Sequence, residues 1–112
     1  MDAMYHARSS VRKWGGEPTD YLAIHEWFDA TSAHVNDFRH RAIRHHSLGV
    51  ADAVQRFGRM LTISTGKSVP VKQIAERHLI EDLGFIPTVA DWVRQIDATP
   101  WMRSKQKRVM SF

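Results

Sequence analysis

Apolar side chains recur at helical spacing through most of this chain, and a glycine or a proline closes almost every run. Residues 3 to 14 carry the first run, which ends at Gly15 and Gly16. Glycine readily adopts the left-handed conformations found after a helix. The next run covers residues 18 to 30 and begins with the segment PTD, a typical helix start. We therefore predict a helix on each side of the glycine pair.

A third helical pattern is much longer. It begins at Thr31 and Ser32 and continues as far as Phe57, just before Gly58. Gly49 lies inside this pattern, and we expect it to kink the helix without ending it. The sequence therefore predicts one long central helix.

The pattern changes to a period of two between residues 60 and 71, around the turn glycine of the segment STGKS. Helical spacing then returns as far as Gly84, and a last helix begins at Thr88. The predicted fold is mainly α: a compact bundle of about five helices with one short β-hairpin (about residues 60–71).

Size and composition indicate a single domain. A chain of 112 residues with 43% hydrophobic residues is large enough for one core and too small for two. We expect one helical, histidine-rich domain over residues 1–102, followed by a basic and flexible C-terminal tail over residues 103–112. No apolar stretch approaches the roughly 20 residues of a membrane helix, and the N-terminus lacks the apolar run of a signal peptide. We therefore predict a cytoplasmic protein with no membrane partner.

The net charge is +4, with a sequence pI near 9.9. Basic chains gain affinity for phosphates through counterion release, which raises the question of nucleic-acid binding. Much of the excess lies in the C-terminal tail, however, and short basic tails are often simply solvated. Charge alone is a weak argument for a nucleic-acid partner.

Histidines are the most unusual part of the composition. Six of the seven fall in two blocks: His25, His34, His40, His45 and His46 in the first, and His78, beside Glu81 and Asp82, in the second. Imidazole ligates Zn, Fe, Ni or Cu and shuttles protons near neutral pH. Because the chain has no cysteine, a metal would be held by His, Asp and Glu. This pattern predicts a metal or acid–base site.

His78 and Asp82 give the strongest local signal. They are four residues apart, so they share one helix face and can offer two ligands to one ion. The same stripe carries Ile74 and Ala75, which directs the pair into the protein. A buried carboxylate needs a cation or a donor. Either a metal binds the Asp82 carboxylate, or Arg41 forms a buried ion pair with it and the arrangement is purely structural.

Helical angles restrict the other ligands. On a continuous helix His34 and His45 project about 20° apart but lie about 16 Å apart along the axis, so one ion cannot take both. His45 and His46 lie at the edges of the apolar side. The predicted metal ligands are His78 and Asp82 with His45 or His46, and His34 is a secondary candidate. His25 and Asp29 repeat the spacing of four and are candidates for a second ion or for a supporting role.

Five segments carry a resemblance that spans nearly the whole chain: YHARSS, DYLAIHEWFD, HVNDFRHRAIRHHSLGV, STGKSVPV and HLIEDLGFIPTVADW. They resemble a family of small histidine-rich bacterial and bacteriophage proteins classed as a domain of unknown function. Its most specific parts are RHRAIRHH at 39–46 and HLIEDLG at 78–84. The resemblance implies a stand-alone, mainly helical domain and carries no activity.

A looser similarity links RHRAIRHHSLGVADAV and the downstream HLIED to the HD phosphohydrolases, whose helical His and Asp residues hold divalent metals. This chain has no adjacent His-Asp dipeptide, so His78 and Asp82 would have to replace that pair at a different spacing. The similarity implies a fold class and no mechanism.

Two classes of function follow. In the first, the protein is a metal-dependent hydrolase of phosphoesters that holds Zn, Mn, Fe or Ni and uses no organic cofactor. Glu81 would accept a proton, and Arg41 or Arg44 would steady an anionic substrate. In the second, it is a non-enzymatic phage or mobile-element accessory protein that binds a host protein or nucleic acid. Its histidines then form a buried hydrogen-bond network.

Overall fold

Two capped helices open the chain, as predicted. In the computed structural model, which describes residues 1–103, α1 spans Ala3–Trp14 and α2 spans Pro18–Asp29. The Asp2 side chain accepts a hydrogen bond from the Tyr5 backbone amide (2.8 Å) and so caps α1. Gly15 and Gly16 follow with φ of 85° and 81°, conformations that glycine adopts without strain.

The predicted long central helix is wrong. Residues 30–57 form four pieces: the 3₁₀ turns η1 (Ala30–Ala33) and η2 (Phe38–His40), then α3 (Arg41–Arg44) and α4 (Ser47–Phe57). Two polar side chains make the breaks. Asp37 accepts from the Arg39 amide (2.8 Å) and His46 accepts from the Gly49 amide (3.0 Å), so each caps a new helical start. The angular comparison of His34 with His45 therefore does not apply.

Gly49 allows α4 to pack closely against the end of α3. A Cβ atom built at this position would lie 1.7 Å from the carbonyl oxygen of Arg44. The first turn of α4 therefore lies directly against the last residue of α3, and only glycine leaves room for it. The predicted kink at Gly49 is replaced by a break just before it, at His45 and His46.

The hairpin forms as predicted. β1 (Met60–Thr62) pairs antiparallel with β2 (Ser68–Pro70), with Leu61 opposite Val69, and Gly66 turns the chain with φ of 89°. The Asp20 side chain accepts hydrogen bonds from the amide and hydroxyl of Ser64, which fastens the loop to the start of α2.

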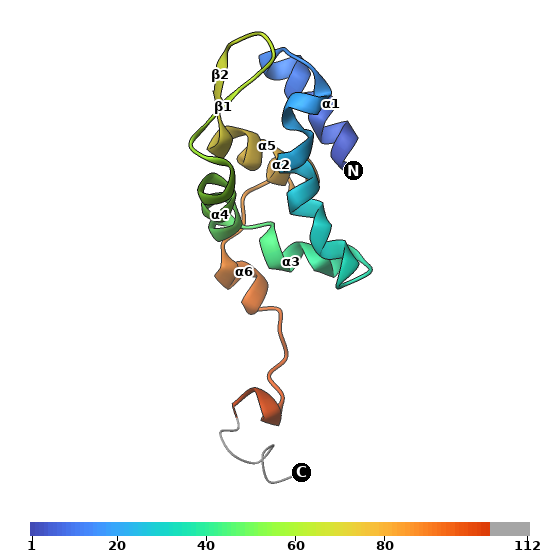
Figure 1. Cartoon of the computed structure of the whole chain (residues 1–112). Helices are drawn as coiled ribbons and strands as arrows, with labels where there is room; N and C mark the ends of the chain where they lie inside the picture. The colour runs from blue at the N-terminus through green and yellow to red at the C-terminus, as the bar shows by residue number, and fades with distance from the viewer. Residues whose placement is uncertain (104–112) are drawn as a thin grey trace.

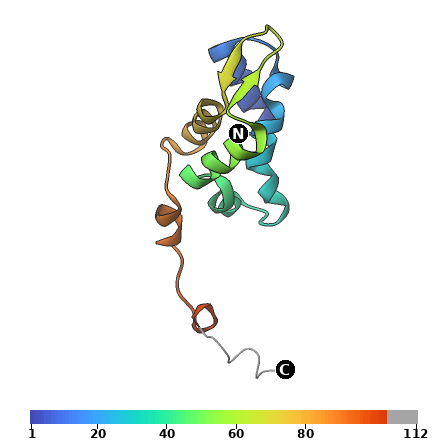
Figure 2. The same ribbon diagram turned by 60° about the vertical axis from the view of Figure 1, so that its left-hand side comes forward.

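α5 (Val71–Leu83) closes the core against α1, α2 and α4 (Figures 1 and 2). Its inner face carries Val71, Ile74, Ala75 and Leu79, all fully buried. The rest of the core comes from the other elements: Ala7, Tyr21, Ile24, Phe28, Val50, Ala53, Ile63 and Val69. The prediction of a mainly helical fold with one short hairpin is confirmed.

After α5 the chain leaves the core. The short α6 (Val89–Val93) is held to it by the Trp92 indole, which donates to the carbonyl of His45 (2.8 Å). Beyond α6 the described segment, including η3 (Pro100–Met102), extends away from the helices in both views (Figures 1 and 2). Apart from Arg103, the predicted basic tail lies outside the described residues. No described helix has both the length and the apolar character needed to cross a membrane.

Candidate metal centre

α5 presents a polar pair to the interior. His78 is fully buried, and the Asp82 side chain, one turn later, is 1% exposed. His78 Nε2 lies 3.3 Å from Asp82 Oδ2. The spacing of four residues puts both side chains on one face of the helix, directed at the elements packed against it.

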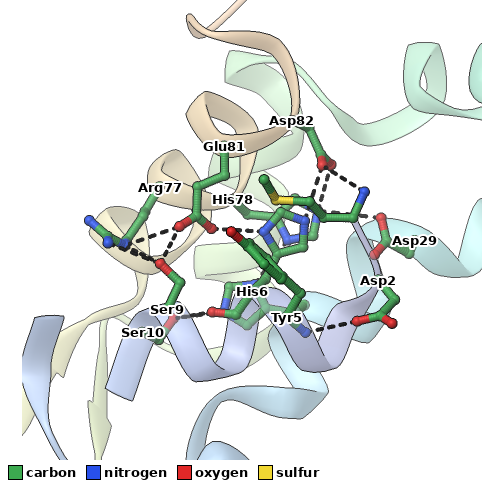
Figure 3. A network of polar contacts seen from close by, with 12 residues as sticks. Asp2, Tyr5, His6, Ser9, Ser10, Asp29, Arg77, His78, Glu81 and Asp82 are labelled. Carbon is green, nitrogen blue, oxygen red and sulfur yellow. Dashed lines mark hydrogen bonds and ion pairs between the residues drawn. The ribbon is translucent and has the colours of Figure 1, made fainter. Parts of the chain in front are cut away.

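Two further side chains reach the same point. Asp29 is the last residue of α2, and His45 is the residue that ends α3. His45 Nε2 lies 3.0 Å from Asp82 Oδ2, 3.2 Å from His78 Nε2 and 3.6 Å from Asp29 Oδ1. Asp29 Oδ1 is 3.3 Å from His78 Nε2. Figure 3 shows Asp29 and Asp82 both directed toward His78, so residues far apart in the sequence converge on one small volume.

The spacing of these four atoms is that of ligands around one ion. A metal held at about 2.0–2.1 Å by four ligands in a tetrahedron separates the ligand atoms by roughly 3.3–3.4 Å. The five separations given above run from 3.0 to 3.6 Å. Two imidazole nitrogens and two carboxylate oxygens also form a ligand set typical of zinc and related metals. Asp29, His45, His78 and Asp82 therefore have the geometry to hold one divalent ion.

Burial and hydrogen bonds shift the pKa values of Asp82, His45 and His78 in different directions. Burial acts to raise the pKa of Asp82, but hydrogen bonds with His45, His6 and His78 outweigh it and hold the pKa well below its usual range. Burial lowers the pKa of His45. Burial also acts to lower the pKa of His78, yet its hydrogen bonds with Asp29 and Asp82 prevail and the pKa is raised. The Asp82 carboxylate is therefore ionised, and its negative charge favours a bound cation.

The second ring nitrogen of His78, Nδ1, faces His25 and not the four-residue group. It lies 2.9 Å from Nδ1 of His25, whose Nε2 lies 2.8 Å from the Ser10 hydroxyl. Burial, with repulsion from His78 and His6, lowers the pKa of His25 to about 2, so this ring is neutral. Ser10 donates in turn to the backbone carbonyl of His6 (3.1 Å). A line of buried hydrogen bonds therefore joins α1 and α2 to the group.

His6 supports Asp82 from α1. Its Nε2 lies 3.1 Å from Asp82 Oδ1, and its Nδ1 lies 2.8 Å from Glu81 Oε1. The Ser9 hydroxyl donates to Glu81, and Arg77 donates to Ser9 (2.9 Å from its Nη2), as Figure 3 shows. Both ring nitrogens of His6 therefore face carboxylate oxygens of α5, and these contacts hold Glu81 and Asp82 against α1.

Arg41 lies at the edge of the group. Its Nη2 is 3.7 Å from Asp82 Oδ1, and its side chain is 25% exposed. The amino group of Met1 is at the same distance from that oxygen. Arg41 therefore faces the same oxygen as His6, and leaves Asp82 Oδ2 to the histidines.

The structure brings together some of the candidate residues and separates others. His45, His78 and Asp82 meet at one point, with Arg41 beside them. The remaining candidates lie elsewhere: His34 is exposed, His46 caps α4 through Nδ1 and donates to the Ile43 carbonyl through Nε2, and Glu81 faces His6, Ser9 and Arg77.

A second trio, His6, His25 and His78, also lies close together. His6 stacks on His78, with centroids 3.8 Å apart and an interplanar angle of 28°, whereas the nearly parallel His25 and His78 rings meet edge to edge through their Nδ1 atoms, 2.9 Å apart. The nitrogens of His6 face Glu81 and Asp82, and those of His25 face His78 and Ser10, so the trio does not offer three free lone pairs at one point. This trio serves as packing and hydrogen bonding behind the four-residue group.

The sequence pattern does not identify two residues of the site. The spacing of four pairs Asp29 with His25, but its carboxylate lies against His45 and His78. His6 lies outside both histidine blocks. Its signal is the i, i+3, i+4 arrangement of His6, Ser9 and Ser10 on α1, three polar residues on the face that also carries the buried Ala7.

A model of the family described as Domain of unknown function (DUF6915) matches residues 1–102. No curated protein and no solved structure matches the chain. The chain belongs to this family, and the predicted membership in a family of unknown function is confirmed. Its bacterial or bacteriophage origin and the likeness to HD phosphohydrolases stay predictions.

Proposed function

We propose that the protein binds one divalent metal ion through Asp29 Oδ1, His45 Nε2, His78 Nε2 and Asp82 Oδ2. The observation that carries the proposal is the spacing of these atoms, 3.0–3.6 Å over the five measured pairs. This range brackets the roughly 3.3–3.4 Å edge of a tetrahedral site.

The structural alternative, an ion pair of Arg41 with Asp82, explains less of the geometry. Arg41 faces Oδ1 of Asp82, whereas Oδ2 faces two imidazole nitrogens that are only 3.2 Å from each other. Asp29 Oδ2 is also buried without a partner among the described residues. A buried carboxylate oxygen without a donor is costly, and a cation bound to Asp29 offsets that cost.

Zinc fits the ligands best. Imidazole nitrogen and carboxylate oxygen bind Zn at about 2.0–2.2 Å, and four-coordinate sites are its usual geometry. Mn, Fe and Ni accept the same ligand types and generally prefer more ligands than four. We expect Zn to bind tightest of these, with Mn weakest.

Competition with a chromophoric chelator tests the site. Stripped wild-type protein should take up one Zn per chain, and His78→Gln and Asp82→Asn should each weaken binding by 100-fold or more. His34→Ala is the matched control, because this histidine is exposed and is not among the residues whose ligand atoms meet in the group, and the affinity of this variant should equal that of the wild type. Equal Zn affinity in all four proteins would contradict the assignment of His78 and Asp82 as ligands.

We further propose phosphoester hydrolysis at this ion, on the strength of its open side. Catalytic zinc sites keep one position for water. Asp29 has a side chain that is 25% exposed and makes the longest contact in the group, 3.6 Å to His45, so a water would reach the ion on this side as a fifth ligand. A bound ion would lower the pKa of that water, and Arg41, 25% exposed, stands where it can bind an anionic substrate.

Turnover of p-nitrophenyl phosphate by the Zn- or Mn-loaded protein tests this second step. Arg41→Gln should raise KM, and His78→Gln should abolish turnover. Absence of turnover on this and on a phosphodiester, with one ion bound per chain, would make the ion structural and favour the non-enzymatic alternative.

A further inference from the structure

Two aromatic rings pack against the imidazole of His78. The His6 ring stacks on it with a centroid distance of 3.8 Å, and the Phe28 ring lies at 5.0 Å with an interplanar angle of 26°. These contacts fix the plane of the imidazole. They do not decide which of its two nitrogens carries a proton, and only a nitrogen without a proton can bind a metal.

The hydrogen bonds behind the ring decide that question. The carbonyl oxygen of His6 can only accept, so the single proton of the Ser10 hydroxyl is directed to it (3.1 Å). Ser10 Oγ must then accept from Nε2 of His25 (2.8 Å). Each of these side chains is at most 1% exposed, so water does not substitute for a member of the chain.

The hydrogen bond of His25 with Ser10 also sets the donor and the acceptor in the bond between His25 and His78. Among residues 1–103 no carboxylate hydrogen-bonds to the His25 ring, and with its proton on Nε2 its Nδ1 is an acceptor. His78 Nδ1, 2.9 Å away, must therefore donate. A neutral His78 then carries its lone pair on Nε2, the atom that faces Asp29, His45 and Asp82.

We propose that Ser10 and His25 are positioning residues that fix His78 as the tautomer with a free Nε2 lone pair, and so prepare the group for its metal. This inference rests on the proposed metal binding. Partners of this kind raise the affinity of metal sites, and their loss typically costs 10–100-fold.

The test compares two buried hydroxyls. Ser10→Ala removes one that bonds a histidine ring and a histidine carbonyl. Thr31→Val removes a hydroxyl with the same two partner types, His40 Nδ1 (2.9 Å) and the His40 carbonyl (3.2 Å), and His40 is neither a proposed ligand nor a hydrogen-bond partner of His78. Zn affinity, measured on full-length protein by chelator competition, should fall 10–100-fold in Ser10→Ala and stay within about 2-fold in Thr31→Val. Equal affinities in both variants and the wild type would overturn the proposal.

Long-range ¹H–¹⁵N correlation spectra give a second readout that a merely structural role would not move. In the wild type His25 should be protonated at Nε2, and in the Zn-loaded protein His78 should be protonated at Nδ1. Protonation of His25 at Nδ1 would contradict the proposal even if Ser10→Ala fails to fold. A wild type that binds no Zn would overturn the metal site itself, whereas Zn binding with the wrong tautomers would overturn only the positioning role.

Discussion

At the residue scale, the site separates what spacing can predict from what it cannot. His78 and Asp82 lie on one helix, so the spacing of four residues was enough to place them together. Asp29 and His45 stand at helix ends, where the backbone direction sets where a side chain points. His6 joins the network from α1, 75 residues before Glu81. No local pattern encodes such contacts, which depend on how the helices pack.

The low pKa of His25 predicts acid sensitivity in metal-free protein. The folded pKa is about 2, against 6.5 for a free imidazole, so only the unfolded chain takes up this proton as pH falls from 6.5. The contribution of His25 is therefore complete above pH 6.5 and should fall by about 1.4 kcal/mol per pH unit below it, with His45 adding to the slope. The raised pKa of His78 gives a contribution that is fully present below pH 6.5 and is lost as pH rises above it, so it does not change the slope on the acid side.

Urea unfolding with a chelator present, between pH 6 and 4.5, measures this slope. His25→Gln removes the group that titrates only in the unfolded chain, so its slope should be shallower than that of the wild type. Identical slopes in the two proteins would show that His25 is not neutral in the fold.

His46 should prove structural. Its Nδ1 caps α4 by accepting from the Gly49 amide, so His46→Ala should lower the free energy of unfolding by about 1 kcal/mol. Zn affinity should not change, because neither ring nitrogen faces the metal group. A drop in Zn affinity as large as that of His78→Gln would instead make His46 a ligand.

At the element scale, the helices with clear boundary residues were predicted and the central one was not. Gly15, Gly16 and Gly84 mark helix ends that the structure shares. Residues 31–57 carry enough apolar periodicity to suggest one helix, but Asp37 and His46 cap new starts inside it. A histidine is an uncommon cap, so its effect was not visible in the sequence.

Gly49→Ala tests the close contact between α3 and α4. In an ordinary helix this change stabilises by up to about 1 kcal/mol. Here the new Cβ would meet the Arg44 carbonyl oxygen, so we expect a loss of about 3 kcal/mol. Ala51→Gly, on the exposed side of the same helix, should cost about 1 kcal/mol. Urea denaturation compares them, and a stabilised Gly49→Ala would contradict the observed packing.

At the scale of the whole molecule, the proposed ion joins three separate helices. Its ligands come from the end of α2, the residue that follows α3 and the C-terminal half of α5. Because these ligands are brought together only by folding, binding energy adds to the stability of the fold.

Zn at 100 times its dissociation constant should add about 2.7 kcal/mol. For a domain of this size that corresponds to a rise in Tm of roughly 10–20 °C, measurable by circular dichroism. His78→Gln should show no such rise. An equal rise in that variant would place the stabilising ion elsewhere on the protein.

Elemental analysis of the full-length wild type tests the central claim most directly. The protein would be purified without a His tag or chelator, dialysed against Zn and then against metal-free buffer. The metal centre described here predicts close to one Zn per chain. A content near zero after this treatment would contradict it, and would leave Asp29, His45, His78 and Asp82 as a hydrogen-bond network that holds the helices together.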